Sequence, residues 1–197
     1  MANNENSTKV TTGIIRFSYV HLLEPHAAQP GQDEKYSVQL LIPKTDTKTL
    51  DKIHAAQEAA KQAGKSSKWG GKVPGNLKMT LRDGDEEHDT DDEPAYKGMM
   101  FMNVSSNTKP GIVGTQRGED GKLKAIDDED EIYSGMYGRA SINFYAYNSN
   151  GSKGVTAGLN NVQKTRDGER LGGGHTKAED DFDDWEDDTD EDEDLLG

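Results

Sequence analysis

The chain has 197 residues, 31% of them hydrophobic and 30% charged, which is polar for a single globular domain. It contains no cysteine, so disulfide scaffolds, thiolate zinc sites and cysteine nucleophiles are excluded. Its formal net charge of −14 hides a basic portion: the segments 83–93, 127–131 and 178–197 hold 26 of the 37 acids, and the rest carries 11 acids against 23 Lys and Arg, a net charge of +12.

The first half of the chain predicts two strands followed by one helix. Residues 10–20 alternate loosely between apolar and polar side chains, and residues 35–42 alternate more clearly. Over residues 47–63 the apolar period changes to that of a helix, and alanine is abundant. Gly64 follows at the position where a helix C-cap is expected.

The second half predicts short strands separated by long loops. A Gly/Lys/Ser loop around Trp69 follows the helix, and two acidic loops, 83–93 and 127–131, come later. Residues 139–147 form the clearest strand, and a short turn joins them to residues 153–163 as a hairpin. Further strands or strand fragments are expected at residues 77–82, 99–104 and 111–114.

This inventory predicts a mainly β fold, a five-stranded antiparallel OB-fold-like barrel with one inserted helix and long loops. A β-sandwich is the alternative, although a sandwich usually has seven strands. We expect a flexible N-terminus (1–9), a barrel domain (10–167), a flexible linker (168–177) and a disordered acidic C-terminal tail (178–197).

No enzyme or metal motif is complete in the sequence. Gly71-Lys72 and Gly121-Lys122 lack both the upstream glycine and the following Ser or Thr of a phosphate-binding loop, and Gly64-Lys65-Ser66 lacks the upstream glycine. The acidic run from Asp83 spaces its carboxylates as calcium loops do, but His88 replaces the turn glycine and Pro94 the last glutamate. We therefore predict no catalytic residue, no metal and no cofactor. Neither a signal peptide nor a membrane span is apparent, so we expect an intracellular protein.

Cations and aromatic side chains on outward strand positions and in the Gly/Lys/Ser loop around Trp69 predict a site for single-stranded nucleic acid. Such a site needs cations to follow the phosphates and aromatic faces to stack with bases. The predicted binding residues are Arg16, Lys35, Lys65, Lys68, Trp69, Lys72, Lys78, Arg82, Arg139, Tyr145 and Tyr147. Each also has a purely structural interpretation: Trp69 can close the end of the barrel, the tyrosines can be ordinary strand residues, and the cations can simply aid solubility.

The acidic C-terminal segment contains large apolar residues that solvation alone does not need. Phe182, Trp185, Leu195 and Leu196 lie in or next to its thirteen carboxylates. This combination predicts a partner-binding anchor, with the carboxylates steering it towards basic surfaces.

The sequence resembles the single-stranded-DNA-binding proteins of tailed bacteriophages, most closely their OB-fold type. The shared features are the basic barrel, its helix, the Gly-rich linker and the acidic tail. The resemblance covers roughly residues 10–177 and the tail. It is carried mainly by Lys35–Pro43 (KYSVQLLIP) and by Ser134–Gln163 (SGMYGRASINFYAY…GVTAGLNNVQ). It implies a tail that recruits replication proteins and competes with DNA, and a location in the cytoplasm of the infected bacterial host.

The sequence thus predicts a non-catalytic protein that coats and protects single-stranded DNA in phage replication and recombination, and that recruits a polymerase, helicase or recombinase through its tail. The alternative is an acidic interaction module, a DNA mimic or assembly factor that binds basic proteins. An accessory nuclease or recombinase is a third interpretation, for which no carboxylate site is evident. The net charge of +12 outside the acidic segments favours the first.

Overall fold

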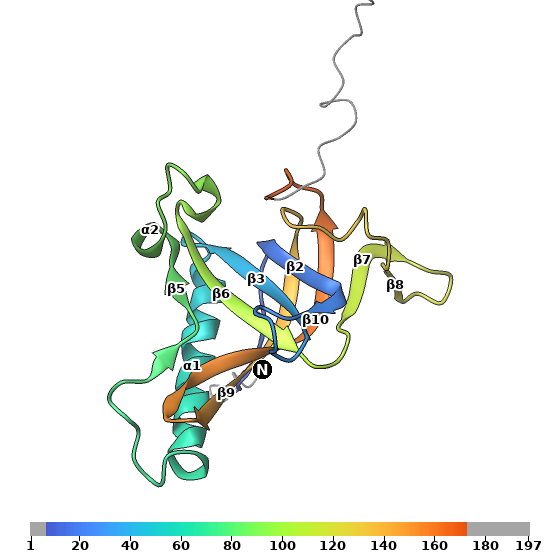
Figure 1. Ribbon diagram of the computed structural model, residues 1–197. Coiled ribbons are helices and arrows are strands. Elements are labelled where there is room, and N and C mark those ends of the chain that lie inside the picture. The colour runs from blue at the N-terminus through green and yellow to red at the C-terminus, as the bar shows by residue number, and fades with distance from the viewer. Residues whose placement is uncertain (1–6, 173–197) are drawn as a thin grey trace, which may run out of the picture.

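The computed structural model describes residues 7–172, which form a barrel with one long helix beside it (Figure 1). The expected flexible N-terminus lies largely outside the described residues. Residues 173–177 of the expected linker, the acidic tail and its anchor residues Phe182, Trp185, Leu195 and Leu196 lie entirely outside them.

Five strands close into a ring, as the sequence predicts. They are β2 (Ile15–His26), β3 (Lys35–Pro43), β6 (Met99–Ser106), β9 (Tyr137–Ser149) and β10 (Ser152–Arg166). The pairs run β2–β3–β6–β10–β9 and back to β2. Four of these pairs are antiparallel, but β10 and β6 are parallel, so the barrel is not antiparallel throughout.

Shorter strands extend this ring. Strand β1 (Lys9–Thr11) pairs with β9, and β7 (Gly111–Arg117) pairs with β10 and carries β8 (Leu123–Ala125) on its outer edge. Strands β4 (Lys78–Met79) and β5 (Arg82–Asp83) pair with β10 and β6. The short helices α2 (Gly84–Glu87) and η1 (Pro94–Tyr96) follow β5.

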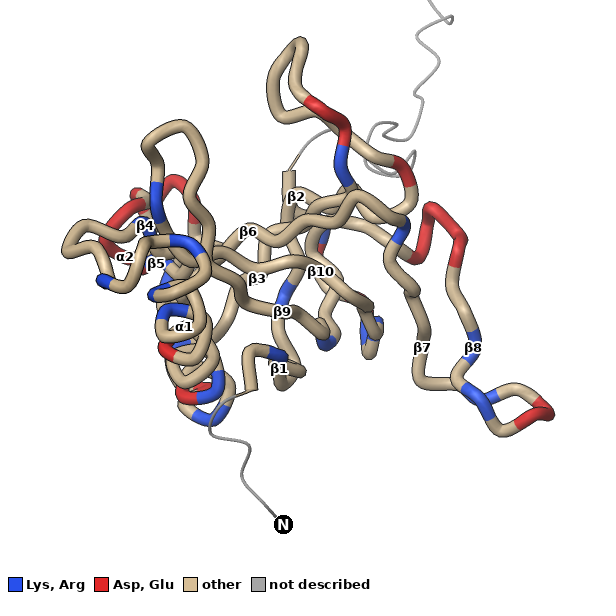
Figure 2. Tube along the Cα trace, turned by 90° about the horizontal axis from the view of Figure 1, so that it is seen from below, with Lys and Arg blue, Asp and Glu red and all other residues tan. Residues whose placement is uncertain are grey.

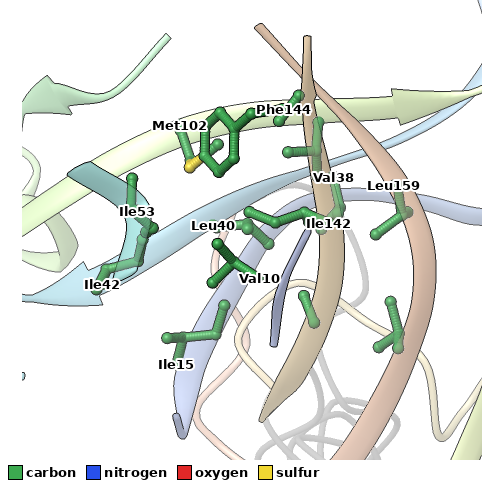
Figure 3. Close-up of a cluster of buried hydrophobic side chains, with 14 of the residues drawn as sticks. Val10, Ile15, Val38, Leu40, Ile42, Ile53, Met102, Ile142, Phe144 and Leu159 are labelled. Atoms are coloured by element: carbon green, nitrogen blue, oxygen red, sulfur yellow. The ribbon is translucent and has the colours of Figure 1, made fainter. Parts of the chain in front are cut away.

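The interior of the barrel is filled by alternate residues of each strand. Val38, Leu40 and Ile42 of β3 are buried against Ile142 of β9 and Met102 of β6 (Figure 3). This follows from the two-residue period of a strand, which sends every second side chain inward. The intervening residues face outward, where Leu41 of β3 and Phe101 of β6 form a second buried cluster with Tyr96.

Helix α1 (Thr47–Ser67) packs on the barrel through Ile53, Ala56 and Ala60, and its first turn is capped by Asp46. It extends four residues beyond the predicted end because Gly64 is not a C-cap. A Cβ atom on Gly64 would overlap Ala146 of β9, so this glycine permits the close approach of helix and strand.

Three further predictions need correction. The first predicted strand is divided into β1 and β2. Residues 77–82 form no single strand: they contain all of β4 and the first residue of β5, and these pieces pair with different strands. The first acidic loop contains α2, and strand β8 was not expected at all.

Within residues 7–172 no helix is long and apolar enough to cross a membrane.

Residues 167–172, which we call the C-terminal clasp, are held against the barrel and are not a free linker. The Leu171 N–H donates to the Ser134 carbonyl (2.9 Å), and the Gly168 N–H donates to the Tyr133 hydroxyl (3.0 Å). Arg16 donates to the Glu169 carbonyl (2.6 Å). Any linker therefore begins after these contacts, not at Gly168.

Candidate nucleic-acid interface

A groove of about 650 Å³ on the outside of the barrel brings together five of the residues selected from the sequence. We call it the outer groove. It is lined by Lys35, Lys78, Met79, Thr80, Arg82, Asn103, Ser105, Tyr145, Tyr147, Ser149, Val155 and Thr156. No Asp or Glu is among these residues.

Strand geometry explains why these side chains share one surface. Phe144 and Ala146 of β9 enter the core, so Tyr145 and Tyr147 face outward. The β4 pairing sets Lys78 opposite Gly154 of β10. Gly154 has no room for a side chain, because a Cβ atom would overlap the Tyr147 ring and the Lys78 carbonyl. The glycine keeps this end of the groove open for the tyrosine.

Three cations lie around a floor of neutral polar side chains. Lys35 begins β3, Lys78 lies on β4 and Arg82 on β5, while Asn103 and Thr156 belong to the floor. Among residues 7–172, neither lysine forms a salt bridge. Arg82 is different: its Nε donates to Glu87 of α2 at 2.5 Å, and its guanidinium lies over the Phe101 ring. Figure 2 shows this acidic segment beside β4 and β5.

Tyr145 offers a large aromatic face to the groove. Its side chain is 48% exposed, whereas most other large apolar side chains of the described segment are buried. Thr156 of β10 pairs with Tyr145, and Gly158 lies beside the Tyr145 ring, where a Cβ atom would be 3.8 Å from it. Tyr147 is half-buried in the same lining. Such exposed rings next to cations are the elements that single-stranded nucleic acid binding requires.

Trp69 does not line the outer groove, and its burial favours the structural interpretation, in which it closes the end of the barrel. Its side chain is only 8% exposed and packs in the barrel core beside Gly64. The indole N–H donates to the Tyr147 carbonyl (3.2 Å). Trp69 therefore fastens the end of α1 to the hairpin of β9 and β10.

Two selected arginines are also occupied by structural contacts. Arg16 donates to the carbonyls of Gly135 and Glu169 and lies over Tyr137. Arg139 donates through Nε to the Thr12 carbonyl (3.0 Å), which links β9 to the end of β1. Neither lines the outer groove. Their guanidinium groups hold chain segments together.

The three lysines around Trp69 lie outside the groove lining as well. Lys65 belongs to the last turn of α1, and Lys68 and Lys72 follow in the loop; all three are exposed. The Lys68 carbonyl accepts a hydrogen bond from Asn148 in the β9–β10 turn. This contact sets the loop next to the hairpin tip, where it forms a separate basic surface.

Sequence analysis missed the polar floor and one exposed aromatic residue. Asn103, Ser105 and Thr156 alternate with core residues, a signal that was present but is not specific for binding. Tyr19 on β2 is 61% exposed and lines a second pocket, yet its strand shows only loose alternation. Within the described segment, no group of His, Asp and Glu could hold a metal ion.

Comparison with known proteins identifies the family of this chain. Residues 8–196 match the family model described as the single-stranded-DNA-binding protein of Enterobacter phage Enc34. The chain belongs to this phage single-stranded-DNA-binding protein family. It is therefore an ssDNA-binding protein and not an enzyme.

Individual relatives agree with this assignment. A protein called putative protein p50, from Acyrthosiphon pisum secondary endosymbiont phage 1, is 31% identical over 186 residues, which cover 89% of this chain and 93% of the relative. The structure of the Enc34 protein in complex with ssDNA has a TM-score of 0.68 at 26% identity, covering 87% of this chain and 97% of that one. The T7 protein gp2.5 shares the fold alone, with a TM-score of 0.54 at 18% identity over 84% of this chain and 90% of that one. The predicted OB-fold-like barrel is thus confirmed.

Proposed function

We propose that this protein coats single-stranded DNA without sequence preference during phage replication and recombination, in the cytoplasm of the infected bacterium. The observation that supports it is the outer groove, where Lys35, Lys78 and Arg82 surround two outward-facing tyrosines with no carboxylate in the lining.

Different residues of the groove bind the phosphates and the bases of the DNA. The cations attract phosphates and release counterions, so the affinity falls with salt. Tyr145 and Tyr147 stack with bases, and stacking tolerates any sequence because every base has a π-face. The floor offers hydroxyl and amide groups from Asn103, Ser105 and Thr156. Duplex DNA should bind weakly, because paired bases cannot reach the rings.

We further propose that the acidic tail recruits a polymerase, helicase or recombinase through Phe182, Trp185, Leu195 and Leu196, and that it competes with DNA for the groove. The C-terminal clasp supports this role because it fixes where the chain leaves the barrel. The thirteen carboxylates of residues 178–197 give the tail the charge of a polyanion.

The test is a fluorescence anisotropy titration of a labelled oligothymidine with four proteins: wild type, Tyr145→Ala, Lys78→Ala and Lys122→Ala. Loss of the Tyr145 ring should weaken binding by about 1–3 kcal/mol. Loss of Lys78 should also reduce the log–log salt slope by about 0.7. Lys122 is the matched control, because it is exposed at the β7–β8 turn and does not line the groove.

Two results would contradict the proposal. If Lys122→Ala weakens binding as much as Lys78→Ala, the charge of the whole protein, and not the groove, governs affinity. If duplex DNA of equal length binds as tightly as the single strand, the groove does not accept unstacked bases.

A further inference from the structure

Tyr19 adopts a backbone conformation that bulky residues rarely accept. Its φ is +47°, in the left-handed region, and it lies where the pairing of β2 with β3 shifts register between Ser18 and His21. An exposed aromatic residue held in this region stores strain, and such strain is concentrated at functional sites. Its ring is 61% exposed, so the barrel core gains little from it.

The Tyr19 ring lines a pocket of about 530 Å³, which we call the Tyr19 pocket. Tyr96 forms another part of its wall and is rigidly held: its hydroxyl donates to Gln39 (2.6 Å), and its ring stacks on His88 at 3.6 Å. Burial, with a contribution from Tyr19, raises the pKa of Tyr96 to about 12, so its hydroxyl keeps its proton. The pocket volume is in the range that holds a small planar ligand.

The pairing register connects this pocket to the outer groove. Ser18, beside Tyr19, pairs with Gln39, and Gln39 pairs with Asn103 in the groove floor. The parallel pairing of β6 with β10 then brings Asn103 level with Thr156, which pairs with Tyr145. Four strand spacings of about 4.8 Å separate Tyr19 from Tyr145, or about 19 Å along the curved sheet.

The row is polar, but Ser18 and Gln39 within it are buried. The Gln39 amide donates to Asn103 (3.2 Å), so Tyr96, Gln39 and Asn103 form one hydrogen-bonded chain between the two sites. A further hollow of about 520 Å³ shares Lys35 and Ser105 with the outer groove and includes Ser37, the partner of His21. Tyr96 covers Gln39, so a DNA strand would pass beside this chain, along the hollow that contains Lys35 and Ser37.

We propose that Tyr19 is a second base-stacking position, so that one DNA strand crosses the barrel from Tyr145 to the Tyr19 pocket. This inference rests on the proposed function and extends it. A row of about 19 Å accommodates at most about six nucleotides at the stacked rise of 3.4 Å, within the range of OB-folds. Asp92 and Glu93 line the pocket and repel phosphates, so the pocket takes a base. The backbone would lie on the side of Lys35, in a hollow that Asp33 also lines.

The test measures the affinity of Tyr19 variants for oligothymidines of about 4 and about 12 nucleotides. The shorter one covers only part of the row, and the longer one covers all of it. Tyr19→Asn removes the ring, and asparagine tolerates a positive φ, so the fold should melt at the wild-type temperature or above it. It should weaken binding of the longer oligonucleotide about 5- to 150-fold and change binding of the shorter one little. Tyr19→Phe keeps the ring and should restore the affinity.

Tyr145→Ala is the matched comparison, since it should weaken binding at both lengths. If Tyr19→Asn binds the longer oligonucleotide as wild type does while Tyr145→Ala does not, this inference fails and the proposed function remains. If Tyr19→Asn affects both lengths equally, the strand does not cross the barrel as proposed. If wild type binds neither oligonucleotide, the proposed function itself fails.

Discussion

The pair between Arg82 and Glu87 predicts that one acidic residue weakens DNA binding. Arg82 lines the outer groove, but its Nε donates to the Glu87 carboxylate at 2.5 Å. A phosphate that binds Arg82 must displace or share this partner. We therefore expect Glu87→Gln to raise the affinity for single-stranded DNA.

The size of the effect follows from the exposure of the pair. The two side chains are 49% and 38% exposed, so solvent screens the pair and it contributes about 0–1 kcal/mol. Glu87→Gln should therefore strengthen binding by no more than about fivefold. The gain should be largest near 50 mM salt and fade as the Debye length shortens. The free energy of unfolding should fall by less than about 1 kcal/mol.

Anisotropy titrations of an oligothymidine at several salt concentrations measure this effect. Glu58→Gln is the matched control, because Glu58 is an exposed glutamate on α1 that pairs with Lys61 outside the groove. It changes the net charge by the same amount and should leave affinity nearly unchanged. The reasoning is refuted if Glu58→Gln produces the same gain, or if Glu87→Gln still strengthens binding in an Arg82→Ala background.

Three other predictions concern the core, the clasp and the tail. Trp69→Ala should destabilise the fold by about 3–5 kcal/mol, measured by thermal melting, because it empties a core position. Lys164, only 6% exposed, binds Glu131 and Asp167, which raise its pKa despite burial. The pairing stabilises the fold below a pH of about 10.4, and this stability is lost at higher pH. Above that pH the melting temperature of the wild type should therefore fall more than that of Lys164→Met. Deletion of 173–197 should tighten single-strand binding at low salt, and unchanged affinity would exclude the tail as a competitor.

The strands that sequence predicts best are those whose pattern is local. Lys35–Pro43 and the hairpin of β9 and β10 alternate with a period of two, because their inner faces meet one core. Strand β8 has only three residues and no buried face of its own, so no pattern marks it. The parallel pairing of β10 with β6 joins residues about fifty positions apart, and local periodicity carries no information about it.

The sequence predicts only part of the site, because local patterns show which side chains face outward but not which of them make tertiary contacts. Lys35, Lys78, Arg82, Tyr145 and Tyr147 were found because outward positions on neighbouring strands converge. Arg16, on the first strand, and Trp69, in a Gly/Lys loop, are occupied by tertiary contacts with residues far along the chain. The Trp69 indole reaches the Tyr147 carbonyl, and Arg16 reaches Glu169. A cation or aromatic residue looks the same in sequence whether it binds a ligand or the chain itself.

The C-terminal clasp also limits how strongly the tail can compete for the groove. Gly172, the last residue of the clasp, lines the Tyr19 pocket, so the chain continues from a point about 19 Å from Tyr145 along the sheet. The 25 residues after Gly172 would, as the flexible chain proposed here, have a root-mean-square span of about 25–30 Å. Carboxylates from about the middle of this segment onward therefore reach the groove, while those nearest Gly172 remain near the clasp. Competition should then be partial, leaving the groove open to DNA once a few phosphates have bound.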